Sequence, residues 1–159
     1  IKEYGLQHRE KMTARRYYGV QEKQFHEYYV KADKKAGVTG ENMLTILECR
    51  LDNVVYRMGL ASSRKEARQM VRHAHFTLNG KKVDIPSIIC KVGDVVALRE
   101  KSKASEKFKM LVETSETAVI PKWLEIDHAN ATAKVIALPK RDDIDFPFEE
   151  QLIVELYSK

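Results

Sequence analysis

Long apolar runs and paired cysteines are both missing from this sequence of 159 residues, and each absence excludes a class of protein. No stretch approaches the roughly 20 apolar residues that cross a bilayer, and no signal peptide is visible, so we expect no membrane association. The two cysteines, Cys49 and Cys90, lie far apart without C-x-x-C spacing, which argues against a zinc cluster or a disulfide framework. We therefore expect a protein of the reduced cytoplasm that binds no metal and no cofactor.

Residue patterns typical of catalysis are missing as well. The five histidines share no metal-ligand spacing, and His73 and His75 straddle the junction of an expected helix and strand. No Ser, His and Asp constellation, paired carboxylates or Gly-rich phosphate loop is present, and the acidic residues 142–145 are interpreted as surface charge. The sequence predicts no catalytic residue, and hence a protein that is not an enzyme.

Positive charge, by contrast, is present and concentrated. The formal net charge is +5. Residues 50–82 hold eight Lys or Arg against two Asp or Glu, and residues 1–19 hold five against two, whereas residues 83–159 hold eleven against fourteen. A face that binds phosphates requires such clustering, because each neutralised phosphate releases condensed counterions. The pattern indicates a polyanion partner.

Helical periodicity dominates the first third of the chain. It predicts a strongly basic helix over residues 6–18 ended by Gly19, and a packing helix that Gly37 ends. Asn42 is predicted to cap a third helix. Four apolar residues at helical spacing then predict a short helix before Gly59, and Ser63 with Glu66 forms a capping box that starts the next. The polar face of this last helix carries Lys65, Arg68, Gln69 and Arg72.

After His75 the period changes to two, which predicts strands. Asn79-Gly80 indicates a type I′ hairpin, and a further strand is expected over residues 95–99. A lysine-rich helix over 101–116 and a second hairpin over 123–138 follow. The sequence thus predicts an α+β protein, in which two short helices pack on a small antiparallel sheet and a helical domain precedes them.

A family resemblance rests on several of these segments. The run Leu51-Asp52-Asn53-Val54-Val55-Tyr56-Arg57-Met58-Gly59, followed by Ser62-Ser63-Arg64, resembles the RNA-binding module named after bacterial small-subunit ribosomal protein four. Tyr4-Gly5-Leu6, Arg15-Arg16-Tyr17-Tyr18-Gly19, Thr39-Gly40-Glu41-Asn42 and the ending Leu152 to Lys159 resemble other parts of the same family. Full-length members have a further N-terminal segment, and we expect this sequence, which begins at Ile1, to lack it.

The resemblance implies a division into two domains. Residues 1–50 and about 149–159 would form a helical rRNA-binding domain, and residues 51–148 an α+β domain whose RNA-binding helix pair and hairpin span about 51–113. The acidic stretch 141–150 would connect the two. The resemblance also implies a primary binder of small-subunit rRNA that holds a multi-helix junction, nucleates assembly and contributes to translational accuracy.

The partners that the resemblance implies are small-subunit rRNA, small-subunit proteins five and three, messenger RNA where it enters the ribosome, and the protein's own messenger RNA. We therefore expect a cytoplasmic, ribosome-bound protein. The expected RNA contacts combine the basic residues with nearby hydroxyl, amide and aromatic groups. They are Arg9, Lys11, Arg15, Arg16, Tyr17, Tyr18, Arg57, Ser62, Ser63, Arg64, Lys65, Arg68, Gln69, Arg72, His73, Lys81 and Lys82.

Plainer interpretations remain open for these residues. Surface cations usually form solvated helix faces, and Tyr17 and Tyr18 near a helix end are more often packed than stacked on a base. Lysines beside a hairpin turn, such as Lys81 and Lys82, are commonly only solubilising.

Two alternative functions are also open. The first is a quality-control factor that binds ribosomal particles transiently. The second is a fragment of an RNA-modifying enzyme, because Arg50-Leu51-Asp52 resembles the catalytic triplet of pseudouridine synthases. A separate catalytic domain needs on the order of 150 residues, and this chain has no room for one. Asp52 is expected on an exposed helix face or paired with an arginine.

Overall fold

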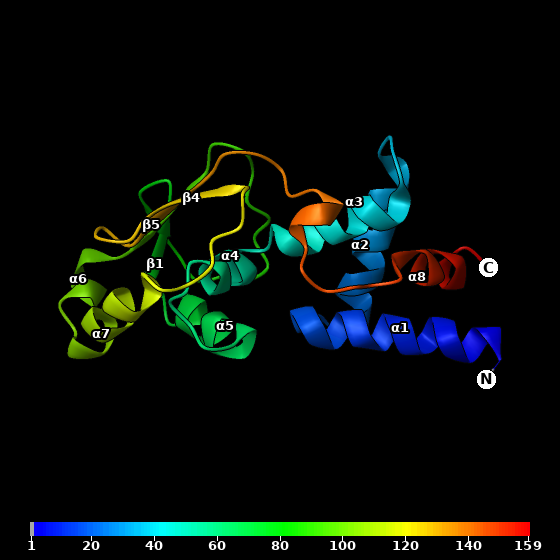
Figure 1. Ribbon diagram of the computed structural model, residues 1–159, viewed down its shortest axis with the longest axis horizontal. Helices are drawn as coiled ribbons and strands as arrows, with labels where there is room; N and C mark the ends of the chain where they lie inside the picture. The colour runs from blue at the N-terminus through cyan, green and yellow to red at the C-terminus, as the bar shows by residue number, and fades with distance from the viewer. Residues whose placement is uncertain (1) are drawn as a thin grey trace. The chain divides into compact units, whose positions relative to one another are not determined.

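The computed structural model describes residues 2–159, which form helices and a five-stranded antiparallel sheet and so confirm the predicted α+β class (Figure 1). The chain divides into two compact units. Unit 1 comprises the residues up to Glu48 together with Lys140–Lys159, and unit 2 comprises Cys49–Pro139. None of the helices within residues 2–159 combines the length and the apolar character that crossing a membrane requires.

Unit 1 is helical, and helices from the two ends of the chain pack together in it. Its elements are α1 (Glu3–Tyr18), α2 (Glu22–Lys34), α3 (Thr39–Glu48), a 3-10 helix η1 (Arg141–Asp143) and α8 (Glu150–Tyr157). Helix α1 ends where Gly19 adopts a left-handed backbone, as predicted. Helix α8 lies against α1 and α3, and α2 packs on α3 (Figure 1).

The role of Asn42 differs from the prediction. Helix α3 begins at Thr39, so Asn42 lies inside it rather than at its cap. The side-chain amide of Asn42 donates to the carbonyl oxygens of Ala32 and Ala36, each at 3.2 Å. Ala32 lies in the last turn of α2, and Ala36 lies in the segment that follows it, where backbone carbonyls lack partners within a helix. Asn42 therefore closes the preceding helix instead of opening its own.

The acidic stretch 141–150 is folded into unit 1, although the resemblance implied a connector. The guanidinium of Arg141 donates through Nε to Glu150 Oε1 at 2.7 Å, and through its other nitrogens to the carbonyl oxygens of Ile144, Phe146 and Phe148. The Arg141 side chain thus holds the loop that precedes α8 in place through these hydrogen bonds. The chain returns to unit 1 at Lys140, nine residues before the expected boundary at about 149.

Unit 2 combines short helices with the sheet. Its helices are α4 (Leu51–Arg57), α5 (Arg64–Arg72), α6 (Glu100–Lys103) and α7 (Glu106–Ser115). Its strands are β1 (Phe76–Leu78), β2 (Lys81–Val83), β3 (Val95–Leu98), β4 (Leu124–Asp127) and β5 (Thr132–Val135), in the order β2-β1-β3-β5-β4. The single helix predicted over 101–116 is two helices, because Ala104 and Ser105 separate α6 from α7.

The predicted hairpin is confirmed. Asn79 and Gly80 both have positive φ, +52° and +84°, as a type I′ turn requires, and Leu78 pairs with Lys81 across it. The side chain of Asn79 also accepts the Val95 N–H at 2.8 Å. The turn is therefore fastened to β3 as well as closing its own hairpin.

The core of unit 2 lies between the helices and one face of the sheet. Alternate residues of β3, Val96 and Leu98, are buried, while α4 and α5 contribute apolar residues to the same cluster. Trp123, which immediately precedes β4, is 1% exposed. The two short helices are thus held by tertiary packing, because helices of seven and nine residues are marginal alone.

We predict that Arg141→Ala lowers the free energy of unfolding by about 2 kcal/mol, because it leaves the Glu150 carboxylate and three carbonyl oxygens without their donor. Urea unfolding followed by far-ultraviolet circular dichroism measures the change. Lys23→Ala, which removes an exposed cation of α2 in the same unit, is the control and should shift the midpoint little. Equal midpoints for both variants would contradict the role given to Arg141.

Candidate nucleic-acid interface

The start of α5 is closed by a capping network displaced by one residue from the predicted box. Ser63 Oγ accepts the Glu66 N–H at 3.1 Å, as predicted. The Glu66 carboxylate, however, accepts from Ser62, both from its N–H at 3.3 Å and from its hydroxyl at 3.1 Å. The hydroxyl of Ser62, which was expected to reach RNA, already donates within the protein. Of the two serines, Ser63 is the better candidate donor to a ligand.

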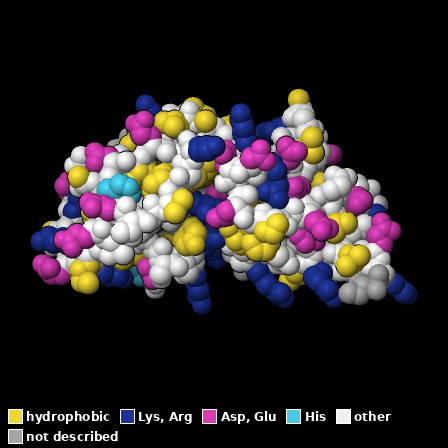
Figure 2. All heavy atoms as spheres, in the orientation of Figure 1, with side chains coloured by type: hydrophobic (Ala, Val, Ile, Leu, Met, Phe, Trp, Pro, Cys, Tyr) yellow, Lys and Arg dark blue, Asp and Glu magenta, His cyan; other side chains and the backbone are white. Residues whose placement is uncertain are grey.

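One face of α5 is exposed and carries charge. Lys65, Gln69 and Arg72 follow one another at i, i+4 and i+7, so they lie on the same side of the helix, opposite the buried Ala67 and Val71. We call Lys65, Gln69 and Arg72 the outer face of α5. In Figure 2, Lys and Arg side chains project from the edge of unit 2 where Figure 1 draws α5.

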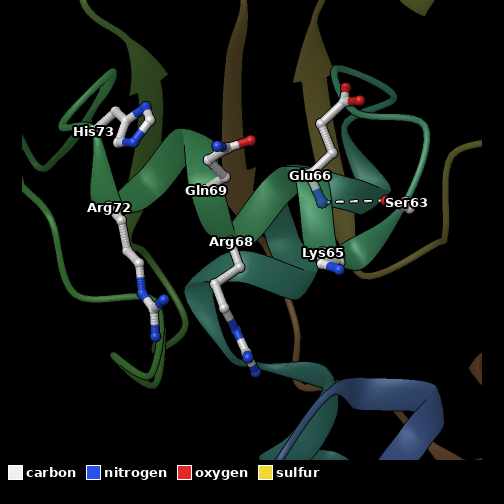
Figure 3. A pocket seen from close by; sticks show the side chains of 7 residues that line it. All are labelled: Ser63, Lys65, Glu66, Arg68, Gln69, Arg72 and His73. Carbon is white, nitrogen blue, oxygen red and sulfur yellow. Dashed lines mark hydrogen bonds between the residues drawn. The ribbon is translucent and has the colours of Figure 1, made fainter.

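A shallow hollow of about 530 Å³ borders this face. Figure 3 shows its lining side chains, with Arg68 and Arg72 extending to the same side of the helix. The lining is basic, since three cations face one carboxylate. It consists of Ser63, Lys65, Glu66, Arg68, Gln69, Arg72 and His73. All of these except Glu66 were predicted RNA contacts, so the structure brings six of the expected residues around one open hollow.

Arg64 and Arg68 have partners on α4. Arg64 Nε donates to Asn53 Oδ1 at 2.8 Å, and its guanidinium lies 4.4 Å from the centre of the Tyr56 ring. Arg68 Nε lies 3.6 Å from Asp52 Oδ2. Arg64 is half-buried and belongs to the packing of the two helices rather than to the outer face. This role could have been predicted from helical periodicity, because positions 64 and 68 lie next to the buried residues Ala67 and Val71 on the helix.

Asp52 is buried between two guanidinium groups. Its carboxylate accepts from Arg50 at 3.1 Å and 2.9 Å, in addition to its ion pair with Arg68. The expectation that Asp52 pairs with an arginine is confirmed, and the alternative of an exposed helix face is wrong, since the residue is 2% exposed. Asn53, the next residue, is also buried, at 1% exposed, and no pattern in the sequence predicted this.

The remaining candidates of unit 2 are dispersed. Lys81 and Lys82 are exposed on β2, away from the lining of the hollow. Arg57 lies beside the ring of Tyr56, with its guanidinium carbon 5.9 Å from the ring centre. His73 is exposed at the end of α5.

His75 and Cys90 are packed within unit 2, His75 partly and Cys90 almost wholly buried. His75 Nδ1 lies 2.8 Å from Ser102 Oγ, and burial, followed by the nearby charge of His73, lowers the pKa of His75. Burial raises the pKa of the Cys90 thiol to about 12. Within residues 2–159, no group of three or more His, Cys, Asp or Glu side chains is arranged to hold a metal ion.

On α1 the structure separates exposed cations from paired ones. Arg9 and Arg16 are exposed. Lys11 and Arg15 both pair with Glu22 of α2, at 3.1 Å and 3.4 Å. Burial opposes ionisation of Glu22, but hydrogen bonds from Lys11 and Tyr157, with the charges of Lys11 and Arg15, bring its pKa below the usual value. Lys11 and Arg15 therefore join two helices of unit 1.

The two tyrosines of α1 pack within unit 1, which is the plainer interpretation of their place near a helix end. Tyr18 is 1% exposed, and its hydroxyl donates to Glu48 at 2.6 Å. The ring of Tyr17 lies against Phe146 and Phe148, at 4.9 Å and 5.1 Å between ring centres. A base cannot stack on the buried Tyr18 ring, whereas Tyr17 is partly exposed.

Two families match consecutive parts of the chain. The family described as "Ribosomal protein S4/S9 N-terminal domain" matches residues 1–48, and the family described as "S4 domain" matches residues 49–96. The boundary between the two matches coincides with the boundary between the two units of the structure.

Curated relatives match over the whole chain. The protein named "Small ribosomal subunit protein uS4" of Acetivibrio thermocellus is 63% identical over all 159 residues, which cover 76% of its length. The proteins of the same name from Clostridioides difficile and Heliobacterium modesticaldum are 60% and 59% identical, with the same coverage. Identity at this level over the full chain, together with the two family matches, assigns both units at once: the chain belongs to the uS4 family of small ribosomal subunit proteins.

Proposed function

We propose that this protein is a structural component of the small ribosomal subunit that binds small-subunit rRNA through the outer face of α5 and the basic hollow beside it. The observation that carries the proposal is the alignment of Lys65, Gln69 and Arg72 on one exposed side of a capped helix, in a chain of the uS4 family. Within residues 2–159, Lys65 and Arg72 enter no ion pair, so their charges are available to phosphates.

The chemistry of the hollow suits folded RNA better than a base sequence. Double-stranded RNA offers phosphates and 2′-hydroxyls at regular spacing, while its bases are inaccessible in a deep groove. Lysine and arginine bind phosphates, and the Gln69 amide and Ser63 hydroxyl suit 2′-hydroxyls. The N-terminus of α5 adds the partial positive charge of its backbone amides. Binding should therefore depend on RNA shape.

Arg9 and Arg16 of α1 form a second basic surface, which supports RNA binding through two separate surfaces of the protein. Each surface would bind a different element of a multi-helix junction and so hold the junction together. A protein that does this early would nucleate assembly of that rRNA region. The uS4 resemblance further supports contacts with small-subunit proteins five and three and with incoming messenger RNA, a contribution to translational accuracy, and binding of the protein's own messenger RNA.

The two alternative functions fare differently. The uS4 family is structural and not enzymatic, so the fragment of a modifying enzyme is excluded. Asp52, the carboxylate of the suspected triplet, is also buried in an ion pair. A transient quality-control factor would be released when ribosomal particles are washed, whereas a ribosome-bound component sediments with small subunits after high-salt washing.

We predict that Lys65→Ala with Arg72→Ala weakens binding to small-subunit rRNA and flattens the plot of log K against log salt by up to about 0.9 for each lost contact. Filter binding across a salt series measures both quantities. Arg68→Ala is a poorer test, because it also removes a partner of the buried Asp52 and so combines a binding effect with a folding effect.

The matched control is Lys101→Ala with Lys122→Ala, which removes the same charge from exposed positions of unit 2 outside the hollow. This control should leave the slope close to that of the unmodified protein. Unchanged affinity and slope for the Lys65 and Arg72 variant would remove α5 from the interface.

For α1 we predict that Arg9→Ala with Arg16→Ala weakens binding to the intact junction and has little effect on an RNA that contains only the element bound by α5. Removing residues 1–19 is unsuitable, since it deletes the buried Tyr18 and Ala14 of unit 1. Lys31→Ala with Lys34→Ala, two exposed cations of α2, is the control. If both variants bound the junction equally well, RNA binding would not use two separate surfaces.

A further inference from the structure

Two adjacent polar residues of α4 are almost wholly buried. Asp52 is 2% exposed and Asn53 is 1% exposed. Burying a carboxylate or an amide without a hydrogen bond is costly, so each must be bonded within the protein. Asp52 pairs with Arg68, and Asn53 accepts from Arg64 at 2.8 Å. Neighbouring positions of one short helix thus bind two arginines of the next.

The two arginines lie one turn apart on the same side of α5, because they are four residues apart. A single attachment leaves a helix able to rotate about its own axis, whereas two attachments separated by a turn fix both its rotation and its position along the axis. The Tyr56 ring, 4.4 Å from the Arg64 guanidinium, limits the first attachment further. Since the outer face belongs to the same rigid helix, its direction is fixed too.

We infer that Asp52 and Asn53 are positioning residues for RNA binding, and that Arg64 acts by attaching α5 to α4 instead of by contacting phosphate. This inference rests on the proposed function of the outer face. A rotated α5 would carry Lys65 and Arg72 away from phosphates whose positions the RNA fold sets, and contacts of this kind are sensitive to displacements of about 1 Å.

The decisive variant is Asn53→Ala, because a side chain that is 1% exposed cannot itself touch RNA. We expect it to weaken rRNA binding by roughly tenfold, since Arg64 loses a hydrogen bond made by a charged group. The slope of log K against log salt should stay unchanged, because no cation is removed. Arg64→Lys, which keeps the charge and loses the planar guanidinium, should behave in the same way.

A merely structural role is separated from a positioning role by a double-mutant cycle. When Lys65 and Arg72 are already alanine, Asn53→Ala should cost much less than tenfold in affinity, because the groups it positions are gone. The control is Val135→Ala in the core of β5, which lowers the melting temperature and leaves every side chain of α4 and α5 in place. Measured well below its melting temperature, this control should bind RNA normally.

Tyr56→Leu provides a second variant if Asn53→Ala does not fold, since Tyr56 is only half-buried. It should also lower affinity with an unchanged slope. Normal affinity for the folded variant, or an equal loss in both backgrounds of the cycle, would overturn the inference. Normal affinity for the Lys65 and Arg72 variant would instead refute the proposed function, so the two failures are distinguishable.

Discussion

The position of α5 on unit 2 depends on the ion pair between Asp52 and Arg68, which joins α5 to α4. Asp52 gives up its hydration to lie among Arg50 and Arg68, and a buried carboxylate is tolerated only when such partners surround it. Replacing one arginine would leave the carboxylate buried with less compensation. The apolar cluster packs α4 on the sheet, and the ion pair attaches α5 to α4. Together they determine where α5, with its basic residues, lies on the surface of unit 2.

The basic residues of the chain fall into two groups with different physical roles. Arg64, Arg68, Lys11 and Arg15 have protein partners and join helices. Lys65 and Arg72 extend from the same scaffold and, within the described residues 2–159, form no ion pair. Pairing the first group with acceptors reduces the repulsion that a cluster of like charges creates, which allows the second group to be concentrated on one face.

Local elements were predictable from the sequence because their causes are local. The capped start of α5, the left-handed stop at Gly19 and the Asn79-Gly80 turn each depend on residues within a few positions of one another. The α+β class followed from the change of period after His75. The hollow was predictable in outline for the same reason, since its lining residues belong to a single helix and its cap.

The roles that could not be predicted depend on partners distant in the sequence. The Tyr18 hydroxyl donates a hydrogen bond to Glu48, and the Tyr17 ring packs on Phe146 and Phe148. Because these partners are distant in the sequence, no local pattern shows that the two tyrosines are packed. Arg64 and Lys65 are neighbours of the same charge type. Helical phase places Arg64 beside the apolar stripe and Lys65 opposite it, but the partner that holds Arg64, Asn53 of α4, lies eleven residues away and no local pattern identifies it.

The choice of side chain at these positions follows from the same geometry. Arginine stands where a planar guanidinium must both stack on a ring and donate to a fixed oxygen, as Arg64 does between Tyr56 and Asn53. Lysine stands at position 65, where a flexible ammonium can adapt to a phosphate. When a rigid helix binds through flexible side-chain ends, little conformational entropy is lost, because only those side-chain ends must become ordered. In the proposed function, fixing α5 within the fold would therefore prepare the outer face for RNA before any RNA is present.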